Sequence, residues 1–164
     1  MIRLHPDQYP GDGVTVHYSE GLKVGYRAYQ SHGVAPLFPF GYGLSYTSFR
    51  FSDLKTAKQQ GRAHVTVSFR VANIGKRAGA EVAQLYLGFP PIAEGNEPSL
   101  QLKGFSKVML NPGESKIIKL QLDQRAFSFW SASGHAWQMA PGTFHVMVGD
   151  SSANTPLGMQ LTVY

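Results

Sequence analysis

The sequence predicts an all-β fold, an antiparallel sandwich of seven to eight short strands behind an irregular N-terminal arm. Its 164 residues suffice for one domain with a buried core. The 18 glycines and 10 prolines would interrupt helices, so a helical bundle is disfavoured. Aromatic residues reach 12% and charged residues only 15%, the opposite of a disordered chain. No apolar run approaches the roughly 18 residues of a membrane span, so no membrane partner is expected.

Residues 1–48 are predicted to form a linker or docking arm rather than an independent fold. This stretch is rich in glycine, proline and tyrosine, and its apolar residues show no sustained period. A short helix is weakly favoured over 20–30, where two glycines count against it. Pro36 and Pro39 then favour an extended path, because proline disfavours helical geometry in the residue before it. The sandwich itself is expected over 49–164.

The clearest strand signal is an alternation of apolar and polar residues over 63–71, with Ala63, Val65, Val67, Phe69 and Val71 on one face. Further strands are expected near 81–88, 100–110, 118–122, 127–130, 136–139, 144–148 and 157–163. Turn signals such as Asn111-Pro112-Gly113 separate them. Many short strands with almost no helical pattern favour an immunoglobulin-like (fibronectin type III-like) sandwich, with a barrel of similar strand number as the alternative.

One segment and a series of shorter motifs carry a family resemblance. Residues 38–49 read FPFGYGLSYTSF, which closely resembles the FPFGxGLSYTxF signature of family 3 glycoside hydrolases, the β-glucosidases and β-xylosidases. YSEGL at 18–22 and VGYR at 24–27 resemble the segment that leaves the second domain of those enzymes. The following motifs are similar to their C-terminal fibronectin III-like domain: VANIG (71–75), GAEVAQLY (79–86), LKGF (102–105), LNPGE (110–114), PGTF (141–144) and VGDSS (148–152).

The resemblance implies a non-catalytic accessory domain that packs against and stabilises the catalytic domains of a parent β-glycoside hydrolase. It also implies that 1–48 continues from the end of a preceding α/β domain. In this family the catalytic aspartate and glutamate belong to earlier domains, and no residue of this chain matches either motif. Parent enzymes of the family are often secreted or periplasmic and sometimes cytoplasmic, so the resemblance leaves localisation undecided.

The residues themselves indicate no catalytic, metal or cofactor site. Cysteine is absent, and no pair of histidines has the i, i+2 or i, i+4 spacing of metal ligands. No Gly-x-Ser-x-Gly elbow occurs. Glu20 and Glu81 lie within the resemblance motifs, and both are expected to make structural hydrogen bonds. The net charge of +5 is spread along the chain without a long basic run, which argues against a nucleic-acid partner.

A cluster of aromatic residues in and after the arm is the candidate site. Its members are Tyr26, Tyr29, Phe38, Phe40, Tyr42, Tyr46 and Phe49. The favoured interpretation is a surface that docks a neighbouring domain; local core packing and a stacking platform for polysaccharide or lignin are the alternatives. Self-association through the exposed arm is a further expected contact. Trp130 and Trp137 have a similar ambiguity, with core packing or pairing within a hairpin favoured.

Overall fold

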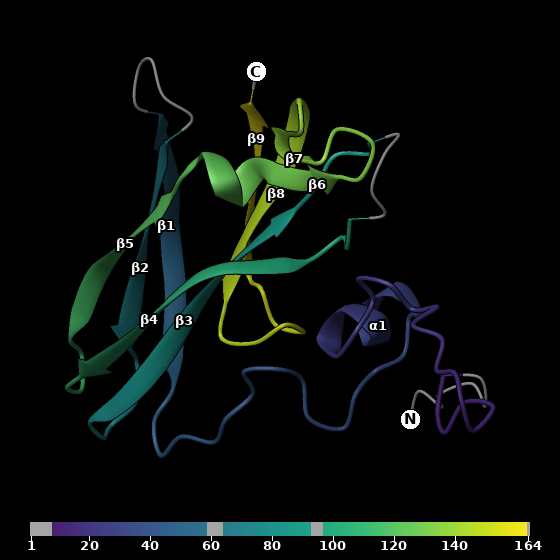
Figure 1. Ribbon diagram of the computed structural model, residues 1–164. Helices are drawn as coiled ribbons and strands as arrows, with labels where there is room; N and C mark the ends of the chain where they lie inside the picture. The colour runs from purple at the N-terminus through teal and green to yellow at the C-terminus, as the bar shows by residue number, and fades with distance from the viewer. Residues whose placement is uncertain (1–7, 59–63, 93–96, 164) are drawn as a thin grey trace.

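The computed structural model describes residues 8–58, 64–92 and 97–163, and these form a β-sandwich with an arm along one side (Figure 1). The described chain contains one short α-helix, α1 (Tyr26–Ser31), and a 3₁₀ turn, η1 (Gln124–Phe127). In these ranges no helix has both the length and the apolar character needed to traverse a bilayer. The nine strands are β1 (Phe49–Lys58), β2 (Val65–Asn73), β3 (Gly79–Gly88), β4 (Gln101–Leu110), β5 (Ser115–Leu122), β6 (Ser128–Ser131), β7 (Ala136–Met139), β8 (Gly142–Gly149) and β9 (Leu157–Val163).

The strands form two packed sheets and a separate hairpin. One sheet has the order β1-β2-β5 and the other β4-β3-β8-β9, while β6 and β7 pair with each other. Every strand pairing is antiparallel. In Figure 1 the β6–β7 hairpin and η1 lie at one end of the sandwich, where η1 leads from β5 into β6. The predicted fibronectin type III-like sandwich is confirmed, and the barrel alternative is not what forms.

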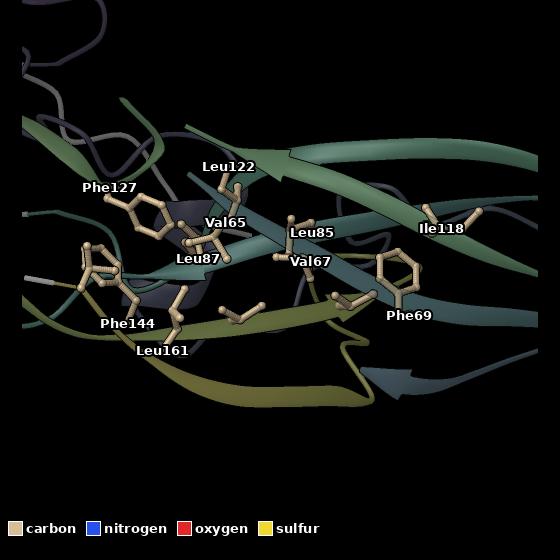
Figure 2. Packing of buried hydrophobic residues seen from close by; sticks show 14 of the residues in the cluster. Val65, Val67, Phe69, Leu85, Leu87, Ile118, Leu122, Phe127, Phe144 and Leu161 are labelled. Carbon is tan, nitrogen blue, oxygen red and sulfur yellow. The ribbon is translucent and has the colours of Figure 1, made fainter. Parts of the chain in front are cut away.

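The core lies between the two sheets and follows the predicted alternation. Along β2, Val65, Val67 and Phe69 are buried in alternation with less buried residues. Leu85 and Leu87 on β3 belong to the same cluster, and Figure 2 shows these side chains converging from the facing strands. The period of two therefore directs one face of each strand inward, as expected from the sequence.

Strand β1 adds one strand to those predicted, and a β-bulge explains why its pattern is weak. Between Ser52 and Lys55 the pairing with β2 shifts register, so two residues of β1 stand opposite one of β2. Asp53 within the bulge has a φ of 58°, a left-handed conformation that aspartate tolerates better than most residues. The shift moves the apolar phase from Phe51 to Leu54, both of which pack against the core.

At the hairpin end of the sandwich the core is closed by three phenylalanines. The fully buried Phe144 ring meets Phe89 and Phe127 edge to face, with centroid distances of 5.0 and 5.1 Å. Edge-to-face contacts between aromatic rings add to the stabilisation from buried area.

We expect Phe144→Ala to lower the free energy of unfolding by about 3–5 kcal/mol, because it removes a fully buried ring and leaves a cavity. The measurement is urea denaturation followed by circular dichroism. Phe105→Ala is the matched control, since Phe105 is exposed, and it should change stability by less than about 0.5 kcal/mol. Equal effects of the two substitutions would contradict this account of the core.

Candidate docking surface

The arm is attached to the outer face of the four-stranded sheet through Tyr26. The Tyr26 ring stacks on Phe40 at 5.1 Å and meets Tyr86 of β3 edge-on at 6.0 Å. Its hydroxyl oxygen accepts a hydrogen bond of 2.9 Å from the backbone N–H of Leu102 on β4. One side chain of the arm therefore contacts two neighbouring strands of the sandwich.

This attachment explains why β3 is buried on both faces along its second half. Leu85 and Leu87 face the core between the sheets, yet Tyr86 on the opposite face is also fully buried. The Tyr86 hydroxyl donates to Oε1 of Gln84, and Nε2 of Gln84 donates to the carbonyl of Asp150. Burial, aided by the nearby Tyr26 and Asp150, raises the pKa of the Tyr86 hydroxyl, so it remains a proton donor at neutral pH.

Gly41 allows the arm to approach this buried network closely. Its φ is +86°, and a Cβ atom built there would come within 2.1 Å of Nε2 of Gln84. One residue earlier, the carbonyl of Phe40 accepts a hydrogen bond of 2.9 Å from the backbone N–H of Ser152. We name these contacts of Tyr26, Phe40 and Gly41 with the sheet the arm clamp.

The predicted aromatic cluster separates into an inward and an outward group. Tyr26 and Phe40 belong to the arm clamp, although Phe40 remains 50% exposed, and Phe49 packs against the edge of the core. The local-packing interpretation therefore describes Tyr26 and Phe49, and Phe40 in part. Tyr29 is half-buried on α1.

The outward group consists of Phe38, Tyr42 and Tyr46. Phe38 is 70% exposed and Tyr46 is 88% exposed, while the rings of Phe38 and Tyr42 lie 5.9 Å apart. Their exposure leaves three aromatic rings of the predicted cluster available for a contact outside this domain.

Two aliphatic residues that the sequence reasoning did not select extend the outward group. Leu37 is 89% exposed and Leu44 is 90% exposed, and both line a depression together with Tyr42. Single leucines in a stretch rich in glycine and proline have no periodicity, so only the family motif, which contains Leu44 and directly follows Leu37, could have indicated them. We name Leu37, Phe38, Tyr42, Leu44 and Tyr46 the arm patch.

The same depression contains the carboxyl groups of Glu81 and Asp150. Oε1 of Glu81 accepts a hydrogen bond of 2.8 Å from the N–H of Val82, and Oδ2 of Asp150 accepts one from Asn154. Partial burial and the charge of Asp150 raise the pKa of Glu81, although the Val82 N–H opposes the shift. The structural hydrogen bond expected for Glu81 is confirmed. In the described ranges, no group of three or more metal-ligating side chains gathers here or elsewhere.

The fold and the clamped arm define a fibronectin type III-like domain, and the model of that domain matches residues 81–152. Thermostable β-glucosidase B of Acetivibrio thermocellus is 43% identical over 91% of this chain. The structure of the β-glucosidase DesR from Streptomyces venezuelae in complex with D-glucose matches 98% of the chain with a TM-score of 0.92 and 38% identity. The family 3 β-glucosidase of Bifidobacterium adolescentis matches 95% with a TM-score of 0.89, also at 38% identity.

This chain belongs to the fibronectin type III-like domains of family 3 β-glucosidases, as the motifs of residues 38–49 and beyond indicate. It spans about a fifth of the length of these relatives: 20% of the Acetivibrio and Streptomyces proteins and 23% of the Bifidobacterium protein. The matched fifth contains the fibronectin type III-like domain and its arm. The predicted resemblance is confirmed.

The arm clamp predicts different effects for two neighbouring glycine substitutions. We expect Gly41→Ala to destabilise the clamp by about 1–3 kcal/mol, because alanine resists a positive φ and its Cβ would collide with Gln84. Limited proteolysis should then cut the arm faster between 27 and 48. The control is Gly43→Ala, since nothing lies within 4 Å of a Cβ at that position. Equal protection in both variants would contradict the clamp.

Proposed function

We propose that this chain is a non-catalytic accessory domain that packs against the catalytic domains of its parent glycoside hydrolase and stabilises them. In this proposal residues 1–48 are the arm that continues from the preceding α/β domain, and 49–164 form the sandwich. The observation that carries the proposal is the arm patch, a group of large apolar side chains exposed on a segment that is itself fixed to the sandwich. Phe38 and Tyr42 are in ring contact, and Tyr42 lines one depression with Leu37 and Leu44; exposed apolar side chains grouped in this way are typical of interaction sites.

Burial of the arm patch supplies the driving force for docking. Removing apolar surface from water contributes about 25 cal/mol per Å², and Leu37, Leu44 and Tyr46 have most of their surface to lose. The arm clamp matters as much as the patch, because an arm already ordered against β3 loses less conformational entropy on docking.

The catalytic activity in this proposal belongs to the parent enzyme and to other domains. The relatives named above are β-glucosidases, which supports a parent that hydrolyses β-glycosides. The carboxyl groups of this domain are held by local hydrogen bonds, as Glu81 and Asp150 illustrate. The domain would thus affect turnover through the stability and placement of its neighbours.

The first test compares two surface substitutions in the full-length protein. We expect Leu44→Ser to weaken docking by about 1–2 kcal/mol, because it removes most of an apolar side chain from the interface. Inactivation by urea should then occur at a lower midpoint. Ile117→Ser on β5 is the control, since Ile117 is also an exposed aliphatic residue. In the isolated chain, neither change should alter the unfolding midpoint. If Leu44→Ser leaves the full-length protein unchanged, the docking proposal is wrong.

A second test uses the chain alone, where the arm patch lacks its partner domain. We expect concentration-dependent self-association through the patch, weakened by the double substitution Phe38→Ser with Leu44→Ser. Sedimentation velocity over a hundredfold range of concentration is the measurement. A monomer at every concentration would count against the patch as an adhesive surface.

A further inference from the structure

A second cleft lies between the arm and the β6–β7 hairpin. Leu22 and Arg27 of the arm, Lys103 of β4, η1 and the β6–β7 hairpin line one cleft. Its volume is about 570 Å³, which falls within the roughly 300–1,000 Å³ of small-ligand sites. None of its lining residues belongs to the arm patch.

One wall of the cleft is a pair of tryptophans. Trp130 and Trp137 stand directly opposite each other on β6 and β7, with ring centroids 5.5 Å apart. Hairpin pairing, one of the two expectations from the sequence, is confirmed. The rings are nevertheless 47% and 46% exposed, so the pair does not complete a core. Flat apolar rings that are partly exposed to solvent can stack on the faces of pyranose sugars.

Three cations from three different elements also line the cleft. Arg27 lies over the ring of Tyr26 at 5.8 Å, Lys103 over Phe89 at 5.0 Å, and Arg125 over Trp137 at 3.1 Å. Within 8–58, 64–92 and 97–163, none of the three forms an ion pair with a carboxylate. Each cation is therefore held by an aromatic face, and the three together outnumber Glu97 and Asp123, the two carboxylates that line the cleft.

The two acidic residues in the cleft already have other partners. Oε2 of Glu97 accepts a 2.6 Å hydrogen bond from the buried Gln101, and Oδ1 of Asp123 accepts one of 3.0 Å from the N–H of Ala126 at the start of η1. Burial lowers the pKa of Lys103, with Arg27 and Arg125 contributing, whereas the charges of Glu97 and Asp123 act in the opposite direction. An anion bound between these cations would offset both the burial of the Lys103 charge and its repulsion by Arg27 and Arg125.

We infer that this cleft binds an acidic glycan, with a uronic-acid ring stacked on Trp130 and its carboxylate held by Lys103 and Arg125. The apolar ring face accounts for the tryptophan pair, and the carboxylate accounts for three cations beside two carboxylates that already accept hydrogen bonds. A charge-assisted hydrogen bond to a carboxylate is among the stronger polar contacts that a protein makes. The choice of a sugar rests on the proposed function, whereas the anionic, stacked character of the ligand rests on the cleft alone.

The test is isothermal titration calorimetry of the chain with two matched ligands at low salt. One ligand is a xylo-oligosaccharide bearing a single glucuronic-acid branch, and the other is the same oligosaccharide without the branch. We expect the branched ligand to bind at least about tenfold more tightly, with affinity that falls as salt is added. Equal binding of both ligands would overturn the acidic part of the inference. The absence of binding by either at millimolar concentration would overturn the site.

Substitutions locate the binding within the cleft. Trp130→Ala and Lys103→Met should each weaken binding of the branched ligand about tenfold or more, while Tyr46→Ala in the arm patch and Lys119→Met on β5 should not. Thermal unfolding of every variant checks that the fold is retained, and Trp130→Phe, which keeps a flat ring, should recover most of the affinity. Tight binding of inorganic phosphate in competition with the sugar would show a general anion site instead.

These results are independent of the docking proposal. Leu44→Ser tests the arm patch and leaves the cleft intact, whereas Lys103→Met does the reverse. Loss of docking with retained glycan binding, or the converse outcome, would therefore separate the two proposals.

Discussion

The arrangement of the whole domain depends on how Tyr86 is buried. A tyrosine in the outer phase of a strand would ordinarily meet water, yet here Tyr26 of the arm, itself stacked on Phe40, packs against it, and Oε1 of Gln84 accepts a hydrogen bond from its hydroxyl. A buried hydroxyl without a partner would cost several kcal/mol, so the network and the covering rings require each other. The sandwich and the arm consequently form one structural unit, although only the sandwich has the regular sequence pattern of a fold.

The fold could be predicted from the sequence wherever burial is one-sided. The alternation through Val65, Val67 and Phe69 identified β2, and two short strand segments on either side of Ser133-Gly134 indicated the β6–β7 hairpin. Strand β1 lost its clear pattern because the bulge at Asp53 shifts its phase. A period of two cannot show a strand whose register changes in the middle.

The candidate site was only partly accessible from the sequence. The aromatic cluster was recognisable from its composition and from the family motif, but its division into a clamp and a patch depends on the close approach of Gly41 to Gln84. That approach joins segments more than forty residues apart. The exposure of Leu37 and Leu44 likewise follows from how the chain turns around the clamp, which no local pattern encodes.

The bulge in β1 has a consequence for how this domain behaves among other copies of itself. β1 is an edge strand of its sheet, and regular edges are templates for intermolecular strand addition and amyloid formation. The bulge interrupts the ladder, and Asp53 pairs there with Arg70 at 2.8 Å, which places charge along the edge. A bulge and a charged pair on an edge strand are two of the features by which natural sheets oppose the addition of a strand from another copy, and this edge has both.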